Sequence, residues 1–176
     1  GISLFPSDGS DITKLVQAAD SAMYLAKQSG KNTWRFFSNS LLEVARQTIA
    51  LQSRIRIALP RREFEVFYQP VIDIAGGNIC AAEALLRWPA GKVGPDEFIP
   101  AAEAVGQIIP IGDWVIEQVC ETHRRWLDAG LPAVPVAVNI SAIQLRNPDF
   151  REKVLSTLRR FDLPTCLLYT SDAADD

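Results

Sequence analysis

The sequence contains only one histidine and three cysteines in 176 residues. Because His123 is the single histidine, the sequence gives little support to catalysis by a histidine pair or a Ser–His couple. Any chemistry must therefore rest on carboxylates and a metal ion. Cys80, Cys120 and Cys166 are odd in number and form no Cys-x-x-Cys pair, which argues against a disulfide framework or a zinc site. We expect three reduced thiols in apolar surroundings.

Long apolar runs and clusters of basic residues are also absent from the sequence. No eighteen consecutive residues are apolar, and the N-terminus has no basic region followed by an apolar core. We therefore expect a cytoplasmic fragment without membrane contact of its own. This expectation leaves open whether upstream segments anchor the parent protein to the inner membrane. The 18 Lys and Arg residues are scattered and the formal net charge is −3, which argues against nucleic acid as a partner.

What is present is the composition of a soluble globular protein, with 48% apolar and 22% charged residues. This composition excludes disorder of the chain as a whole. The length allows one ordinary domain or parts of two.

Residues 1–37 are predicted to form a helix between two short strands. Ile2–Phe5 resembles the end of one strand and Thr33–Phe37 a second strand. Asp11 is placed to cap the helix, and Gly30 to end it. Its predicted apolar face consists of Ile12, Leu15, Ala19, Met23 and Ala26. So small a unit cannot enclose a core of its own, so we interpret it as a piece of a larger domain.

Residues 38–62 are predicted to form a linker helix. Ser40 and Glu43 have the spacing of a capping box, and Pro60 marks the end of the helix. Roughly twenty residues at 1.5 Å each give a spacer of about 30 Å. The helix is amphipathic, so we expect it to pack on one domain. Its broken apolar stripe consists of Leu41, Leu42, Ala45, Ile49, Ile55 and Leu59.

From Glu63 onward strands and helices alternate. The predicted strands are Phe64–Gln69, Ile79–Trp88 and Val134–Ile140, with a Gly76-Gly77 turn between the first two. Two helices are predicted at 97–105 and 111–126, and Gly130 and Pro132 end the second one. A third helix is predicted to be capped by Asn147 and to begin at Pro148. Its inner face consists of Phe150, Val154, Leu155, Leu158 and Phe161. This order predicts an α/β fold, the start of a TIM-type (β/α) barrel. A barrel needs about 250 residues, so we expect it to be incomplete here.

The strand from Cys80 to Trp88 carries an acid and a base among apolar neighbours. Alternation places Glu83 and Arg87 on one face, together with Ala81 and Leu85. Their Cα atoms are about 13 Å apart along a strand, too far for a comfortable ion pair, so each needs another partner. They are either half-exposed and paired with neighbouring structural elements, or part of a functional site.

The amino-acid sequence of this strand favours a functional site. Glu83-Ala84-Leu85 followed by Leu86-Arg87-Trp88 resembles the signature of EAL domains, the bacterial cyclic di-GMP phosphodiesterases. Four more blocks resemble that family in its order: Tyr68-Gln69-Pro70, Phe98-Ile99-Pro100 with Ala102-Glu103, Gly112-Asp113-Trp114-Val115, and Val138-Asn139-Ile140-Ser141. The resemblance covers about residues 60–164 and identifies residues 63–164 as the N-terminal part of an EAL barrel.

The resemblance implies a site for a metal ion and for cyclic di-GMP. By analogy with the family, Glu83 is a catalytic residue and metal ligand, and Asn139 is a second metal ligand. The alternative for Asn139 is a buried amide that satisfies loop backbone. Carboxylate and amide oxygens suit Mg²⁺ or Mn²⁺.

The same resemblance implies substrate contacts. Gln69 and Arg87 would contact the cyclic dinucleotide, Arg87 through a phosphate. Leu86 and Pro100 would line the pocket.

Residues 1–37 resemble the C-terminal helix and strand of GGDEF domains, the diguanylate cyclase fold. The matching blocks are Ala19–Lys27 and Gly30-Lys31-Asn32. The resemblance implies that Lys27 and Lys31 help to bind nucleotide phosphates, and two solvated lysines are an equally good interpretation. The GGDEF signature itself is not in the sequence, so no cyclase activity is expected.

Residues 165–176 depart from the EAL pattern. The resemblance implies a strand here with another metal-binding glutamate, whereas this segment has no glutamate and ends in Ala and Asp, although Leu167–Tyr169 can still form a short strand. We interpret the segment as a foreign ending and expect the isolated chain to be inactive.

The parent is expected to be a tandem GGDEF–EAL protein that hydrolyses cyclic di-GMP to linear pGpG, and a homodimer, as EAL proteins often are. One alternative is a non-catalytic cyclic di-GMP receptor with a degenerate EAL domain. Another is a partial reading frame without function.

Overall fold

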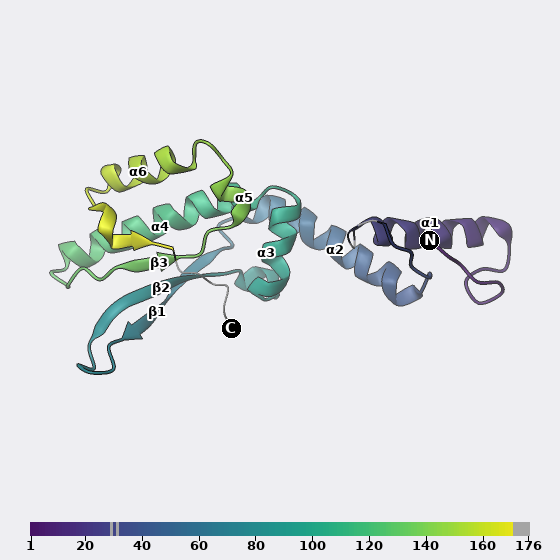
Figure 1. Cartoon of the computed structure of the whole chain (residues 1–176), viewed down its shortest axis with the longest axis horizontal. Helices are drawn as coiled ribbons and strands as arrows, with labels where there is room; N and C mark the ends of the chain where they lie inside the picture. The colour runs from purple at the N-terminus through teal and green to yellow at the C-terminus, as the bar shows by residue number, and fades with distance from the viewer. Residues whose placement is uncertain (29, 31, 171–176) are drawn as a thin grey trace. The chain divides into compact units, whose positions relative to one another are not determined.

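The computed structural model describes residues 1–28, 30 and 32–170 (Figure 1). The chain divides into two compact units, Gly1–Ser53 and Arg54–Asp176. None of the helices in the described part of the chain is both long enough and apolar enough to cross a membrane.

The first unit contains helix α1 (Ile12–Gln28), which begins at the predicted cap. The Oδ1 atom of Asp11 accepts a hydrogen bond from the backbone N–H of Lys14 at 2.9 Å. The predicted apolar face is wrong at two positions, because Ile12 is 74% exposed and Met23 is 39% exposed. The buried side of the helix is formed mainly by small residues, namely Ala18, Ala22, Leu25 and Ala26.

The two predicted strands of this unit reduce to one isolated parallel bridge between Ile2 and Phe36. The backbone N–H of Phe37 donates to the carbonyl of Ile2 at 2.6 Å. The prediction of full strands was wrong because a ladder needs further paired residues, and the described residues of this unit supply only this bridge.

Helix α2 (Asn39–Ala58) forms where the linker helix was predicted and ends before Pro60. It starts one residue before Ser40, so Ser40 is not the residue that precedes the helix. The side chains of Ser40, Leu41 and Leu42 lie outside the described residues. Glu43 accepts a hydrogen bond from the Nε2 atom of Gln47 at 3.2 Å, one turn further along the helix.

The C-terminal end of α2 belongs to the second unit and is tightly packed there. Ile55 and Ala58 are completely buried, whereas Ile49 of the predicted stripe is 50% exposed. Arg54 donates to the carbonyls of Ala90 at 2.7 Å and Gly91 at 3.2 Å.

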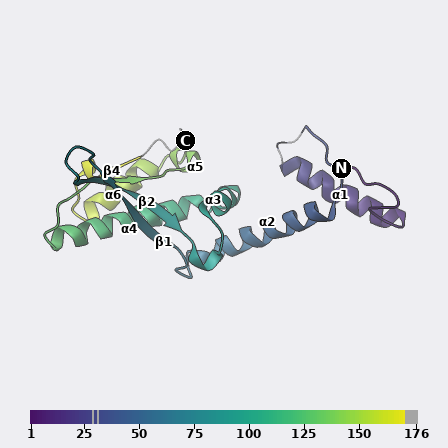
Figure 2. The same cartoon turned by 90° about the horizontal axis from the view of Figure 1, so that it is seen from below.

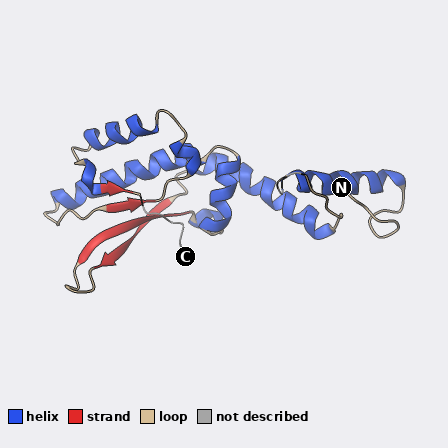
Figure 3. Ribbon diagram, in the orientation of Figure 1, coloured by secondary structure: helices blue, strands red, loops and turns tan. Residues whose placement is uncertain are grey.

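The second unit is built on a four-stranded sheet in the order β1-β2-β3-β4 (Figure 3). Strands β1 (Glu65–Ile72) and β2 (Ile79–Arg87) form the predicted antiparallel hairpin. Strands β3 (Val136–Val138) and β4 (Leu168–Tyr169) continue the sheet in parallel to β2. The helices are α3 (Pro95–Ala104), α4 (Ile108–Asp128), α5 (Ala142–Leu145) and α6 (Phe150–Arg160), with short 3-10 turns η1 (Pro89–Gly91) and η2 (Thr165–Leu167). The α/β prediction is confirmed.

The two faces of this sheet have different surroundings. Tyr68, Ala84 and Val138 lie on the face that meets α4, and the Tyr68 ring stacks edge-on against Trp126 at 5.3 Å. Burial raises the pKa of the Tyr68 phenol. The opposite face is more open, with Phe67 54% exposed. It carries Glu83.

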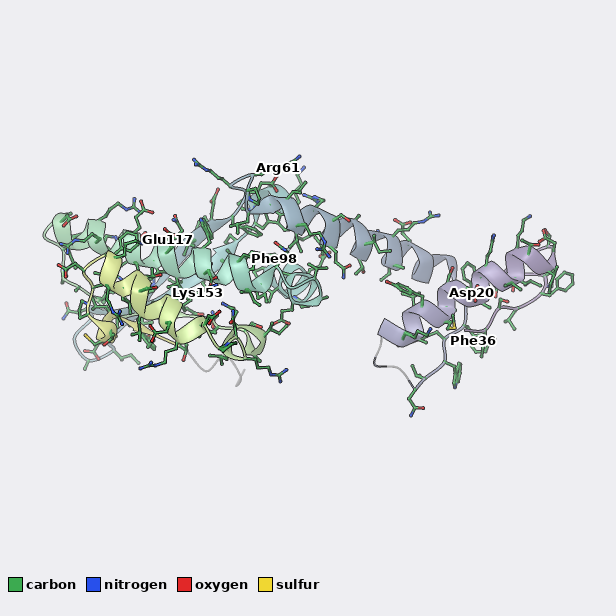
Figure 4. All side chains as sticks on the ribbon, turned by 90° about the horizontal axis from the view of Figure 1, so that it is seen from above. Asp20, Phe36, Arg61, Phe98, Glu117 and Lys153 are labelled. Atoms are coloured by element: carbon green, nitrogen blue, oxygen red, sulfur yellow. The ribbon has the colours of Figure 1, made fainter. Side chains whose placement is uncertain are left out.

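Helices α4 and α6 run beside each other (Figures 1 and 2). Two ion pairs join them: Lys153 to Asp113 at 2.7 Å, and Arg160 to Glu117 at 2.6 Å. Figure 4 marks Glu117 and Lys153. The hydrogen bond to Asp113 raises the pKa of Lys153.

Two predicted boundaries were wrong. Strand β3 is three residues long, because Pro135 has no N–H to continue the ladder, and the chain turns into α5 soon after Val138. Helix α6 begins at Phe150, because Asn147 caps a preceding turn instead: its Oδ1 accepts from the N–H of Asp149 at 3.1 Å. Pro148 is therefore not at the first helical position. Of the predicted inner face, Leu158 is fully buried and the others partly.

The expected environment of the cysteines is right at one position of three. All three thiols are free, but Cys80 and Cys166 are exposed. Cys120, on α4, is buried, and this burial raises the pKa of its thiol to about 11. Cys80 was misjudged because it lies near the hairpin end of β2, where the neighbouring side chains are also exposed.

Candidate active site

The parallel pairing of β2 and β3 brings two predicted metal ligands together. Ala84 pairs with Val138, the last residue of β3, so Glu83, in the middle of β2, lies beside the carboxyl end of β3, which Asn139 follows. The Nδ2 atom of Asn139 donates to the Oε1 atom of Glu83 at 2.7 Å. Glu83 is half-buried and Asn139 is exposed. The partner that Glu83 needs is thus supplied by a residue 56 positions later in the chain.

A third predicted residue lies on the same face of the sheet. Gln69 stands directly opposite Glu83 in the ladder between β1 and β2. Residues directly opposite in an antiparallel pair share a face, with Cβ atoms about 5 Å apart. The exposed Gln69 side chain and the Glu83–Asn139 pair therefore lie across three neighbouring strands.

The Glu83–Asn139 pair offers carboxylate and amide oxygens, the donor atoms that a hard cation prefers. Its two polar atoms are 2.7 Å apart. An amide that turns over presents its oxygen where its nitrogen stood. In residues 1–28, 30 and 32–170, no cluster of three or more His, Cys, Asp or Glu side chains forms a metal site.

Two predicted substrate contacts line a pocket of about 690 Å³ that Asn139 borders, whereas Glu83 is not part of its wall. The pocket lies between the ends of β2 and β3 and helices α3, α4 and α5, and its wall includes Leu86, Arg87 and Asn139. One guanidinium nitrogen of Arg87 donates to the Leu86 carbonyl at 2.9 Å. Pro100 is exposed on α3 and is not part of the described wall, to which α3 contributes Pro95, Ile99 and Glu103 instead.

Beneath Asn139 lies a polar network that the sequence interpretation missed. The Oγ atom of Ser141 donates to the Oε1 atom of Glu103 at 2.5 Å. Ser141 and Gln144 form a capping box at the start of α5. The available signal was the spacing Ser-x-x-Gln, which is typical of a helix start.

The predicted phosphate contacts of the first unit are placed only in part. Lys27 is exposed in the last turn of α1 and borders a pocket of about 520 Å³, together with Asn32 and Thr33. Lys31 lies outside the described residues.

The EAL domain family matches residues 52–169 of this chain. The match begins within α2 and includes all four strands of the sheet. The chain therefore belongs to the EAL domain family.

Among curated proteins, two relatives from Pseudomonas aeruginosa resemble the chain over most of its length. MucR, a bifunctional diguanylate cyclase/cyclic di-GMP phosphodiesterase, is 39% identical over 166 residues, which cover 93% of this chain and 24% of MucR. NbdA, a cyclic di-GMP phosphodiesterase, is 36% identical over 171 residues, which cover 96% of this chain and 22% of NbdA. The chain thus spans about a quarter of the length of these relatives.

Among solved structures, the phosphodiesterase part of MucR in complex with c-di-GMP is similar in fold. Its TM-score is 0.64 at 37% identity, and the match covers 68% of this chain and 49% of that chain. The mixed sheet of β1–β4 is therefore the arrangement of an EAL domain.

Proposed function

We propose that this chain is part of a phosphodiesterase that hydrolyses cyclic di-GMP to linear pGpG with the help of Mg²⁺ or Mn²⁺. The observation that carries the proposal is the contact between Asn139 and Glu83 beside the carboxyl end of the parallel strand β3. Active sites of (β/α) barrels lie at that end of the strands. Related proteins named as cyclic di-GMP phosphodiesterases give the substrate.

In this proposal each residue has a separate role. Glu83 and Asn139 hold the metal ion, which supplies an acidified water and neutralises charge on the phosphoryl oxygens. Arg87, on the wall of the pocket, binds a phosphate of the substrate with its guanidinium fork. Gln69 extends the polar surface toward β1 and contacts the dinucleotide, and Leu86 gives the pocket an apolar wall.

We propose further that residues 1–37 are the C-terminal end of a GGDEF domain and that α2 links it to the EAL domain. The EAL family match spans residues 52–169, and only seven residues follow Tyr169. The relative MucR matches 93% of the chain, so its match must also include most of the residues before residue 52. That relative is named as a diguanylate cyclase as well as a phosphodiesterase. Lys27 is the described residue proposed to contact nucleotide phosphates in this segment.

The test is product analysis after incubation with cyclic di-GMP and Mn²⁺. The protein should carry this chain within a complete EAL domain, and Glu83→Ala is compared with the unsubstituted form. We expect linear pGpG from the unsubstituted protein, and at least 100-fold less from Glu83→Ala, because a lost ligand removes the metal's contribution. Glu97→Ala, an exposed carboxylate on α3, is the matched control.

The second candidate function is a cyclic di-GMP receptor without catalysis. It is favoured by the absence, among the described residues, of any group of three or more His, Cys, Asp or Glu side chains that could hold a metal ion. In that case the same protein binds cyclic di-GMP in equilibrium dialysis and returns it intact.

A further inference from the structure

The direction of the Asn139 side chain depends on a short turn after β3. Upstream, Val138 is fixed by its pairing with Ala84. Downstream, only Ile140 separates Asn139 from Ser141, the residue that caps α5. Two trans peptide units span at most about 7.6 Å between the Cα atoms of Asn139 and Ser141. Contacts that fix the position of Ser141 therefore also restrict the position of Asn139.

Ser141 is held by three hydrogen bonds of its side chain and its N–H, besides the two that its carbonyl accepts at the start of α5. Its hydroxyl donates its single proton to the Oε1 atom of Glu103 at 2.5 Å and accepts from the N–H of Ile143 at 3.2 Å. Its own N–H donates to the Oε1 atom of Gln144 at 3.1 Å. A hydroxyl bound to a carboxylate at this distance belongs to the stronger class of hydrogen bonds.

Gln144 in turn is fixed against α4. It is 2% exposed, and its amide lies where a Cβ atom on Gly112 would be. Its Nε2 atom has no hydrogen-bond partner among the described residues. The orientation of the amide is therefore set by the bond to Ser141 and by the close approach of α4.

Glu103 is not needed for the packing of α3. That helix is anchored by Phe98, Ala101 and Ala102, which are all buried, whereas Glu103 is half-buried at the pocket wall. The carboxylate instead reaches 38 residues along the chain to the turn that carries Asn139.

We propose that Glu103 and Ser141 are positioning residues that aim Asn139 at the metal held with Glu83. This inference rests on the proposed function. Partners that orient a metal ligand typically change metal affinity or activity by 10- to 100-fold when they are removed.

The first test uses this chain without metal and follows the side-chain amide signals of Asn139 by NMR. Their assignment comes from their loss in Asn139→Ala. In Ser141→Ala and in Glu103→Ala we expect these signals to move toward those of a solvated asparagine, because the bond to Glu83 is weakened. Ser141→Thr, which keeps the hydroxyl, and the control Glu97→Ala should leave them in place.

The second test measures Mn²⁺ binding by EPR in a complete EAL domain that contains this chain. Ser141→Ala and Glu103→Ala should weaken Mn²⁺ binding by about 10-fold. Glu103→Gln keeps an acceptor for the hydroxyl and should retain most of the affinity. Saturating Mn²⁺ should restore turnover in all three variants, a recovery that a merely structural defect would not show.

Each outcome is decisive. Unchanged Asn139 signals together with unchanged Mn²⁺ affinity in Ser141→Ala and Glu103→Ala overturn the positioning role alone. If the unsubstituted domain binds no Mn²⁺, the proposed function is overturned and the positioning of a metal ligand with it. Melting temperatures identify any variant that fails to fold. If Ser141→Ala fails to fold, the test is made by comparing Glu103→Gln with Glu103→Ala.

Discussion

At the residue scale, the pairing of an amide with a carboxylate explains how the proposed ligands stay together before a cation binds. The Asn139 amide donates to Glu83, so the contact is attractive in the metal-free protein. Two carboxylates at this distance would repel each other. The asparagine therefore keeps the strand ends in position without metal and offers its oxygen when a cation arrives.

Replacing Asn139 by Asp tests this explanation. In metal-free Asn139→Asp two negative charges face each other at pH 7, and we expect a lower melting temperature than in the unsubstituted protein. Mn²⁺ should raise the melting temperature of the variant. Equal melting temperatures at pH 7 without metal would show that the two side chains do not interact.

A second prediction at this scale concerns the thiols. Cys120 is buried and its pKa is raised to about 11, so at pH 8 only about one thiol in a thousand is ionised. Cys80 and Cys166 are exposed. Ellman's reagent should therefore label two thiols in the folded protein at pH 8 and three in guanidinium chloride. Rapid labelling of three thiols in the folded protein would contradict the described packing of α4.

The sequence indicated the members of the site but not its supports. Glu83, Asn139 and Gln69 were recognisable because they stand in motif blocks, whereas the face that Gln69 shares with Glu83 follows only from the register of β1 and β2. The contact of Glu103 with Ser141 depends on the distance between α3 and the turn after β3, which no local pattern specifies. Gly112 is likewise explained only when Gln144 is seen lying against it.

At the element scale, the end of α2 is joined to the turn that follows β2. Arg54 donates to the carbonyls of Ala90 and Gly91, and its guanidinium lies 5.1 Å from the centre of the Trp88 ring. The Trp88 indole donates to Glu63 at 3.0 Å and packs among Phe64 and Phe98. The turn therefore connects α2 to the strand that carries Arg87.

Gly91→Ala tests this junction. A Cβ atom at Gly91 would overlap the Trp88 indole, which is 2% exposed and has no room to move away. Overpacking of this kind typically costs about 1–3 kcal/mol, so the urea midpoint should fall clearly. Ala90→Ser, at the exposed neighbouring position, should change stability by less than about 0.5 kcal/mol. Equal midpoints for the two variants would contradict the packing.

Elements with strong local signals were predicted well, and elements set by tertiary contacts were not. The end of α4 is an example of the first kind: Gly130 has φ +72°, and the N–H of Leu131 reaches back to the carbonyl of Trp126. Strand β3 is an example of the second kind, because an apolar run says little about how many of its residues find a partner. The start of α6 was misplaced because Asn147 can cap a turn as readily as a helix.

At the scale of the whole molecule, the second unit carries one half-covered sheet. One face packs on helices, and the other presents Glu83 and Gln69 beside exposed apolar side chains such as Phe67 and Tyr169. A polar group in an apolar wall beside the carboxyl end of a parallel strand is typical of a barrel active site. We infer that this open face lines the interior of the EAL barrel.

The central claim is that Glu83 and Asn139 hold one catalytic cation, and the most direct test is the dependence of pGpG formation on Mn²⁺ concentration in a complete EAL domain that contains this chain. We predict that Asn139→Ala raises the Mn²⁺ concentration for half-maximal turnover by at least 10-fold, and that Glu83→Gln lowers turnover at least 100-fold at every Mn²⁺ concentration. Mn²⁺ curves that coincide for the unsubstituted protein and both variants would contradict the account.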